Sequence, residues 1–210
     1  MLERVNTGTT DWSRRFPRLF EDSYVDYAAA RISYVEGVAP EDLVTRLHIV
    51  AVTDHAEVVV CRSARGGRFL PGGTREPGES LRDLATRELI EEAGAVLSGE
   101  LVHFSSHRAD SELAEPYRAH FPHPCAFWGY AVGRVRVTGP PSNPPDGENV
   151  VEELTLPPST AADYLAEEDP LHADVLRHAD ALGLIQGPWL DGSSTMSASA
   201  RTRSGRAVDG

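Results

Sequence analysis

The chain has few cysteines and no long apolar run. Only two of its 210 residues are cysteine, Cys61 and Cys125, and they lie far apart. This excludes a disulfide framework and a Cys-x-x-Cys zinc pair. No apolar run reaches the roughly 18 residues of a membrane-spanning helix, and the first residues lack the apolar segment of a secretory signal. We therefore expect a cytoplasmic protein that does not bind membranes.

Basic residues are also scarce. Lys and Arg number 20 against 32 Asp and Glu, which gives a formal net charge of −12. Such a surface repels phosphate backbones, so we expect no nucleic-acid partner. If the ligand is itself a small anion, metal ions or a local basic patch must bring it in.

The hydrophobic content of 40% suffices for one core rather than two full domains. We divide the chain into an N-terminal extension (1–44, partly helical), a main domain (45–187) and a tail rich in Ser, Thr, Arg and Gly (188–210). The tail has few apolar residues and is predicted to be disordered. Within the extension, a helix is predicted between Glu21 and Val35 from apolar residues near helical spacing.

The main domain alternates strand-like and helical runs. Residues 46–53 and 57–62 predict a hairpin, and helices are predicted over 80–93 and 159–184. Further strands are expected at 99–108, 125–137 and 149–156. This order predicts an α/β (α+β) fold in which helices cover a mixed β-sheet.

The helix at 80–93 has clear end signals. Ser80 is a good N-cap, Asp83 three residues on can complete a capping box, and Gly94 is a natural C-terminal stop.

The buried stripe of this helix changes from leucine to glutamate. At about 100° per residue, the side defined by Leu81 and Leu84 continues into three carboxylates that neighbour one another: Glu88, Glu91 and Glu92. Like charges at this spacing repel, and the last two also lie at the negative end of the helix dipole. A solvated acidic face is the alternative, but here the acidic patch continues the apolar stripe. Hard divalent cations such as Mg²⁺ resolve the conflict, because carboxylate oxygens are their preferred ligands.

The segment from Gly73 to Ala95 resembles the Nudix box of MutT-type hydrolases. That motif is Gly-x5-Glu-x7-Arg-Glu-U-x-Glu-Glu-x-Gly-U, with U aliphatic. The chain supplies its fixed positions as Gly73, Glu79, Arg87, Glu88, Glu91, Glu92 and Gly94. Ala95 at the last position is smaller than usual. The resemblance implies a Nudix fold, a mixed sheet sandwiched between helices.

The resemblance also implies residue roles. Glu88, Glu91 and Glu92 would bind Mg²⁺ (or Mn²⁺) together with the carbonyl of Gly72, and these glutamates with Arg87 would form the catalytic set. The remaining motif residues would be structural: Glu79 as the ion-pair partner of Arg87, with Gly73 and Gly94 shaping the loop and helix end.

The implied activity is Mg²⁺-dependent hydrolysis of a nucleoside diphosphate linked to another group X, by attack of water on phosphorus. Two alternatives stay open: a non-catalytic nucleotide-sensing domain, and a Nudix-fold isopentenyl diphosphate isomerase. Residues 1–44 are candidates for a homodimer contact or for a lid over the substrate.

Substrate contacts are less clear from the sequence. Arg62, Arg68 and Arg75 flank the motif and are candidates for binding phosphates. Trp128 and Tyr130 share one face of a predicted strand, where they could stack on a base or simply pack in the core. Candidates for an additional carboxylate are Glu148, Glu152 and Glu153.

Overall fold

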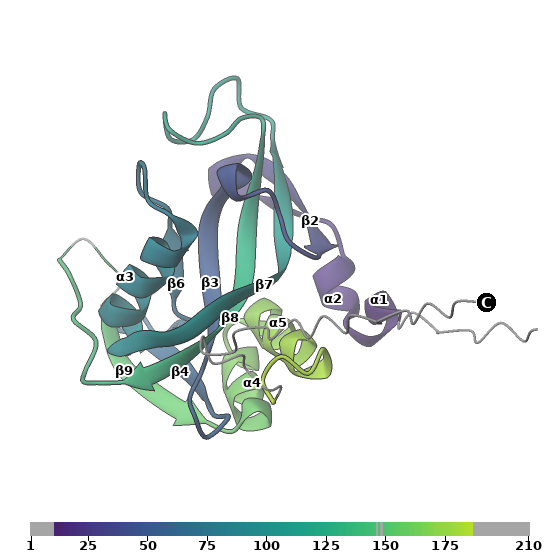
Figure 1. The fold of residues 1–210 in the computed structure, drawn as a ribbon. Coiled ribbons are helices and arrows are strands. Elements are labelled where there is room, and N and C mark those ends of the chain that lie inside the picture. Colours follow the sequence, from purple (N-terminus) through teal and green to yellow (C-terminus); the bar gives the residue numbers. More distant parts are fainter. Residues whose placement is uncertain (1–10, 146, 148, 187–210) are drawn as a thin grey trace, which may run out of the picture.

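The computed structural model describes residues 11–145, 147 and 149–186. In this part of the chain a nine-stranded sheet has the order β1-β2-β7-β8-β3-β4-β5, with β6 paired to β3 and β9 to β4 (Figure 1). β3 and β8 run parallel, whereas the other pairs are antiparallel. The strands are β1 (Ser23–Val25), β2 (Ala30–Glu36), β3 (Val44–Val52), β4 (Val58–Ser63), β5 (Arg68–Phe69), β6 (Gly72–Thr74), β7 (Ala95–Ser111), β8 (Cys125–Val137) and β9 (Val150–Leu156).

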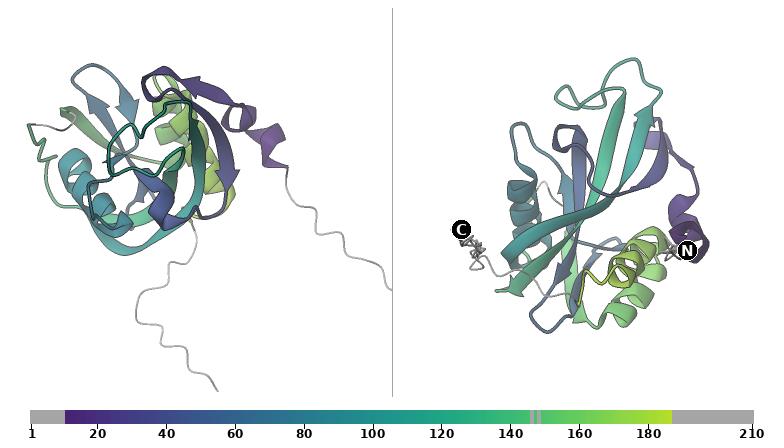
Figure 2. Two further views of the ribbon diagram at one scale, coloured as in Figure 1. Left: turned by 90° about the horizontal axis from the view of Figure 1, so that it is seen from above. Right: turned by 45° about the vertical axis from the view of Figure 1, so that its right-hand side comes forward.

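Helices cover both faces of the sheet. They are α1 (Trp12–Arg15), α2 (Pro17–Phe20), α3 (Leu81–Ala93), α4 (Pro158–Ala166) and α5 (Pro170–Ala181). Figure 2 shows α3 on one side of the strands and the α4–α5 pair on the other. No helix of the described residues is both long and apolar enough to cross a membrane.

Alternation along β3 explains this arrangement. Leu47 and Ile49 pack in the same apolar cluster as Leu84 of α3, while Val50 and Val52 belong to the cluster that contains α4 and α5. Because neighbouring strand residues point to opposite faces, a near-continuous apolar run marks a strand buried on both sides. The predicted fold class, a mixed sheet sandwiched between helices, is confirmed.

The predicted helix between Glu21 and Val35 is wrong. The segment forms β1 and β2, and β2 pairs antiparallel with β7 along its whole length. Ala30, Ile32 and Tyr34 are buried at a spacing of two residues. The apolar residues also fit a helical spacing, but pairing with the edge of β7 satisfies the backbone of the segment and buries the alternating set instead.

The other predictions for the main domain agree more closely. Residues 46–53 and 57–62 fall in the antiparallel pair β3 and β4. The helical run at 159–184 is divided into α4 and α5, because Pro170 cannot continue a preceding helix and begins a new one. The predicted disordered tail lies outside the described residues.

The ends of α3 match their signals. The Ser80 hydroxyl accepts a hydrogen bond from the Asp83 backbone N–H at 3.1 Å. Gly94 ends the helix in the left-handed region with φ 55°, and a Cβ built on it would lie 2.0 Å from the Gly139 carbonyl oxygen. Both the backbone conformation and the close approach therefore require glycine here.

Gly94→Ala is expected to lower the free energy of unfolding by about 2 kcal/mol, from the positive φ together with the contact at Gly139. The matched control is Gly183→Ala, since Gly183 has φ 74° but open space around its Cβ position. This control variant should lose only the contribution of the positive φ, about 1 kcal/mol of the free energy of unfolding. Urea unfolding of both variants measures the difference, and equal losses would show that the contact with Gly139 is unimportant.

Candidate active site

The glutamates of α3 meet the β6 strand at one cavity. Glu88, Glu91 and Glu92 line a cavity of about 520 Å³ together with Gly72 and Gly73. β6 reaches this position because it pairs with β3, which packs under α3. The sequence prediction that these carboxylates lie together is therefore realised in a concave site rather than on an open helix face.

Glu92 is held by the β6 backbone. Its carboxylate oxygen Oε2 accepts a hydrogen bond of 2.8 Å from the Gly72 N–H, and the residue is only 7% exposed. Gly72 has φ 153°, and a Cβ built there would lie 2.2 Å from the Leu47 carbonyl oxygen. Only glycine lets β6 come this close to β3 and present its N–H to Glu92.

The Glu88 carboxylate occupies the space that a side chain at position 73 would need. It is 6% exposed, and a Cβ built on Gly73 would lie 2.1 Å from its Oε1 atom. Burial raises the pKa of Glu88, although the neighbouring Arg87 acts in the opposite direction. The carboxylate of Glu88 is thus costly to ionise in the absence of a further cation.

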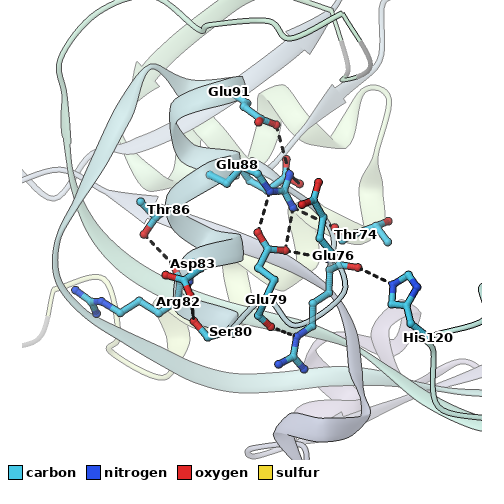
Figure 3. A network of polar contacts seen from close by, with 12 residues as sticks. Thr74, Glu76, Glu79, Ser80, Arg82, Asp83, Thr86, Glu88, Glu91 and His120 are labelled. Carbon is cyan, nitrogen blue, oxygen red and sulfur yellow. Dashed lines mark hydrogen bonds and ion pairs between the residues drawn. The ribbon is translucent and has the colours of Figure 1, made fainter.

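Arg87 links the loop to the helix through Thr74 and Glu79, both labelled in Figure 3. Its Nε and Nη2 atoms contact the two carboxylate oxygens of Glu79 at 2.9 and 3.1 Å, and Nη2 also donates to the Thr74 carbonyl. The predicted ion pair with Glu79 is therefore present. Arg87 Nη1 lies 2.8 Å from Glu88 and 3.4 Å from Glu91. One guanidinium thus serves three carboxylates.

The residues of this cavity fit a hard divalent cation. Their donors are carboxylate and backbone oxygens, and Arg87 partly neutralises two of the cavity glutamates, Glu88 and Glu91. No group of three or more His, Cys, Asp or Glu side chains within the described ranges is already arranged around a single metal position. Glu88 and Glu92 instead accept hydrogen bonds from Arg87 and from Gly72. A carboxylate has several acceptor positions, so each of these side chains can keep its partner and still bind a cation.

Comparison with protein families gives a match to the NUDIX domain over residues 44–179, well over half of the chain. The chain belongs to the Nudix family. A search of curated proteins finds no match. Solved structures do match, among them the crystal structure of a mutant of the Bacillus subtilis pyrophosphohydrolase BsRppH. It is 14% identical, with a TM-score of 0.46, and the alignment covers 65% of this chain and 77% of that one.

The fit of Glu88 against Gly73 leads to a prediction for this Nudix site. Gly73→Ala should displace the Glu88 carboxylate, because the new methyl group would occupy its position. We expect turnover of the substrate to fall at least 10-fold, with a small change in stability, since the end of a glutamate side chain can move. Steady-state kinetics and thermal unfolding measure the two effects. Unchanged turnover would mean that Glu88 need not occupy this position.

The three arginines predicted to bind phosphate do not line the cavity of Glu88, Glu91 and Glu92, called the Nudix cavity below. Each forms hydrogen bonds or ion pairs with other parts of the protein. Arg62 forms an ion pair of 2.9 Å with Glu152. Arg68 pairs with Glu167 at 2.8 Å and stacks over the Tyr164 ring on α4. Arg75 donates to the carbonyls of Glu41 and Glu79 and so braces the loop before α3. The sequence could not show this, because each partner is distant along the chain or lies in a turn.

The candidates for an additional carboxylate lie in different places. Glu152 accepts hydrogen bonds from Arg62 and from the Tyr164 hydroxyl, on the α4 side of the sheet. Glu153 on β9 is the strand partner of Cys61 on β4. The Cys61 thiol donates a hydrogen bond to the Glu92 carbonyl at 3.2 Å. Glu153 therefore lies on the α3 face, and burial raises its pKa, but it does not line the Nudix cavity. Glu148 lies outside the described residues.

The two aromatic candidates, Trp128 and Tyr130, lie in different surroundings. Tyr130 is buried, and its hydroxyl is hydrogen-bonded to His107 Nδ1 at 3.0 Å. Trp128 instead lines a second, smaller cavity beside the first. The difference follows from their positions, because Trp128 lies nearer the start of β8 than Tyr130.

Among the cavity residues that sequence analysis missed are Arg46, His48 and Arg118. A signal existed for the first two. They precede Val50 and Val52 on the same face of β3, so polar residues continue an apolar stripe just as the glutamates do on α3. Arg118 comes from the loop between β7 and β8 and carries no comparable signal.

Proposed function

We propose that this chain is a Nudix hydrolase that cleaves a diphosphate linkage in a small anionic molecule, a nucleoside diphosphate joined to another group. The observation that supports this best is the composition of the larger cavity. It combines the three glutamates of α3 with two arginines, Arg46 and Arg118, in one concave site. Carboxylates suit a divalent cation, and arginines suit the phosphate oxygens that the cation would share.

Glu88, Glu91 and Glu92, with Gly72 beside them, would hold Mg²⁺ or Mn²⁺. When bound, such an ion supplies a positive charge that stabilises the transition state and makes a bound water more acidic. The remaining residues position the site. Glu79 fixes Arg87 at the helix surface, and the Gly72 N–H orients Glu92.

The reaction needs a water molecule that attacks one phosphorus while the bond to the bridging oxygen breaks. A buried carboxylate near the cation can orient this water and accept its proton. Glu88 is placed for this role, because its buried carboxylate lies in the same cavity as Glu91 and Glu92. Arg46 and Arg118, which line the same cavity, would bind the phosphate oxygens and hold the diphosphate in line with the attack.

The first test is a substrate panel of nucleoside triphosphates, nucleotide sugars, ADP-ribose, dinucleotides, coenzyme A and NADH. Phosphate release is measured with and without added phosphatase and pyrophosphatase, in Mg²⁺ and in EDTA. We expect cleavage of at least one compound in Mg²⁺ only, with products that identify the broken bond. No cleavage of any compound, combined with a thermal shift by nucleotides, would instead favour the non-catalytic sensing domain.

A further inference from the structure

The loop between β7 and β8 brings an arginine to the Nudix cavity. This loop comprises residues 112–124 and projects beyond the ends of the two long strands that it joins (Figure 1). Arg118, near its middle, lines the cavity together with Glu88 and Arg46. Arg46 belongs to β3 and is fixed by the sheet. Arg118 instead depends on the conformation of the loop for its position.

A turn within the loop contains Arg118. The Phe121 N–H donates a hydrogen bond of 2.9 Å to the Arg118 carbonyl, and the Arg118 guanidinium lies 5.6 Å from the centroid of the Phe121 ring. This cation–π contact leaves N–H groups of the guanidinium available for phosphate oxygens. His120 lies in the same turn, so a contact that holds His120 also fixes the point from which Arg118 reaches the cavity.

His120 connects this turn to the loop before α3. Its Nε2 atom lies 3.2 Å from the Arg75 carbonyl oxygen (Figure 3). Because a carbonyl oxygen can only accept, Nε2 carries the hydrogen of this bond. The neutral Nε2–H tautomer and the imidazolium form can both donate it, so the contact does not require a protonated ring.

The acceptor of this hydrogen bond is itself held in place. The Arg75 N–H donates to the Thr45 carbonyl at 2.9 Å, and Arg75 Nη1 donates to the Glu41 carbonyl at 2.7 Å. Between this segment and the turn lies a cavity of about 170 Å³, which residues of both line. A hydrogen bond beside a gap, rather than close packing, therefore joins the turn to the segment before α3.

We infer that His120 is a positioning residue of the Nudix site. Its hydrogen bond to the Arg75 carbonyl holds the β7–β8 loop against the segment before α3 and so keeps Arg118 at the cavity, where Arg118 binds phosphate oxygens. This inference rests on the proposed function for the nature of the ligand, a diphosphate. The position of the loop can be measured without any ligand.

The first measurement is the binding of methylenediphosphonate in Mg²⁺ by isothermal titration calorimetry. A CH₂ group replaces the bridging oxygen of this compound, so it binds without being hydrolysed. His120→Ala should weaken binding about 3- to 10-fold, which corresponds to the loss of one hydrogen bond. Arg118→Ala should weaken binding at least as much. The double variant should bind no more weakly than Arg118→Ala, because His120 acts through Arg118.

Two further variants serve as controls. His120→Gln carries an amide N–H close to the position of Nε2 and should restore most of the affinity that His120→Ala loses. Leu113→Ala shortens an exposed side chain of the same loop that does not line the cavity, and it should bind as the parent protein does. Circular dichroism should show that all variants are folded.

Cleavage by trypsin after Arg118 measures the position of the loop without ligand. We expect cleavage of His120→Ala to be about 3- to 10-fold faster than that of the parent protein or Leu113→Ala, because cleavage requires the loop to detach. Unchanged cleavage, unchanged affinity in His120→Ala, or additive losses in the double variant would each overturn the positioning role. Failure of the proposed function would look different: the parent protein would not bind methylenediphosphonate, whereas trypsin cleavage would still depend on His120.

Discussion

Glu92→Gln is expected to lower Mg²⁺-dependent hydrolysis about 100- to 1,000-fold. Glutamine keeps the size of the side chain and can still accept the Gly72 N–H through its amide oxygen. It removes one negative charge from the proposed cation site, and charge stabilisation there is worth several kcal/mol, each 1.4 kcal/mol being tenfold in rate. Glu88→Gln should show a loss of similar size. The measurement is kcat/KM over a range of Mg²⁺ concentrations.

The matched control is Glu100→Gln, which removes the same charge from an exposed position on β7. It should leave kcat/KM within a factor of two of the parent value. If Glu92→Gln kept near-normal turnover at every Mg²⁺ concentration, Glu92 would have no part in catalysis.

The stability of Glu88→Gln separates a functional role from a structural one. Burial raises the pKa of Glu88 in the folded protein. The folded protein therefore loses stability as the pH rises from the ordinary pKa of a glutamate to this raised pKa, and the loss persists at neutral pH. A neutral glutamine avoids this cost. We therefore expect the variant to be as stable as the parent protein or more stable in EDTA at neutral pH. A clear loss of stability would mean that the pair with Arg87 holds the fold together.

His107 should make the fold sensitive to acid. Burial, followed by the proximity of His172, lowers the pKa of His107 from 6.5 to about 4. Below pH 6.5, His107 therefore binds a proton in the unfolded chain, whereas in the folded protein it stays neutral until the pH approaches 4. Stability is full above this pH and falls as the pH drops from 6.5 towards 4, by about 3 kcal/mol for this group alone.

Urea unfolding of His107→Gln and of the parent protein between pH 4 and pH 7.5 tests this expectation. Glutamine can keep a hydrogen bond with the Tyr130 hydroxyl but does not titrate. The variant should lose about 3 kcal/mol less than the parent between pH 6.5 and 4. His55→Gln, in the exposed turn after β3, is the matched control. Parallel curves for the parent and His107→Gln would show that His107 is protonated equally in both states.

The placement of the three glutamates on one helix face could be predicted from the sequence because the information is local. The apolar stripe and the glutamates all lie within one helix of 13 residues, directly after its capping residue Ser80, so helical spacing alone places them on one face. The close packing of β6 could also be anticipated from its glycines, although their partners could not. The buried oxygen beside Gly73 belongs to Glu88, and its position depends on the distance between a strand and a helix.

The N-terminal strands and the substrate contacts could not be predicted in the same way. Ile32 is compatible with a helix or a strand, and the edge of β7 decides between them from more than 70 residues away along the chain. Arg62 and Arg68 are similarly held away from the site by Glu152 on β9 and by Glu167 just after α4. A charged residue beside a motif is therefore weak evidence for ligand binding until its ion pairs are known.

The attachment of β2 to β7 has a practical consequence for any shortened form of this protein. A chain trimmed to the start of the family match would keep every glutamate of α3, but it would lose the strand that covers β7. The seven β7 residues opposite β2 would then present unpaired backbone groups along an open edge, which is a template for sheet-to-sheet association between molecules. The stretch that carries the glutamates and the stretch that folds without an open sheet edge are therefore different lengths of chain.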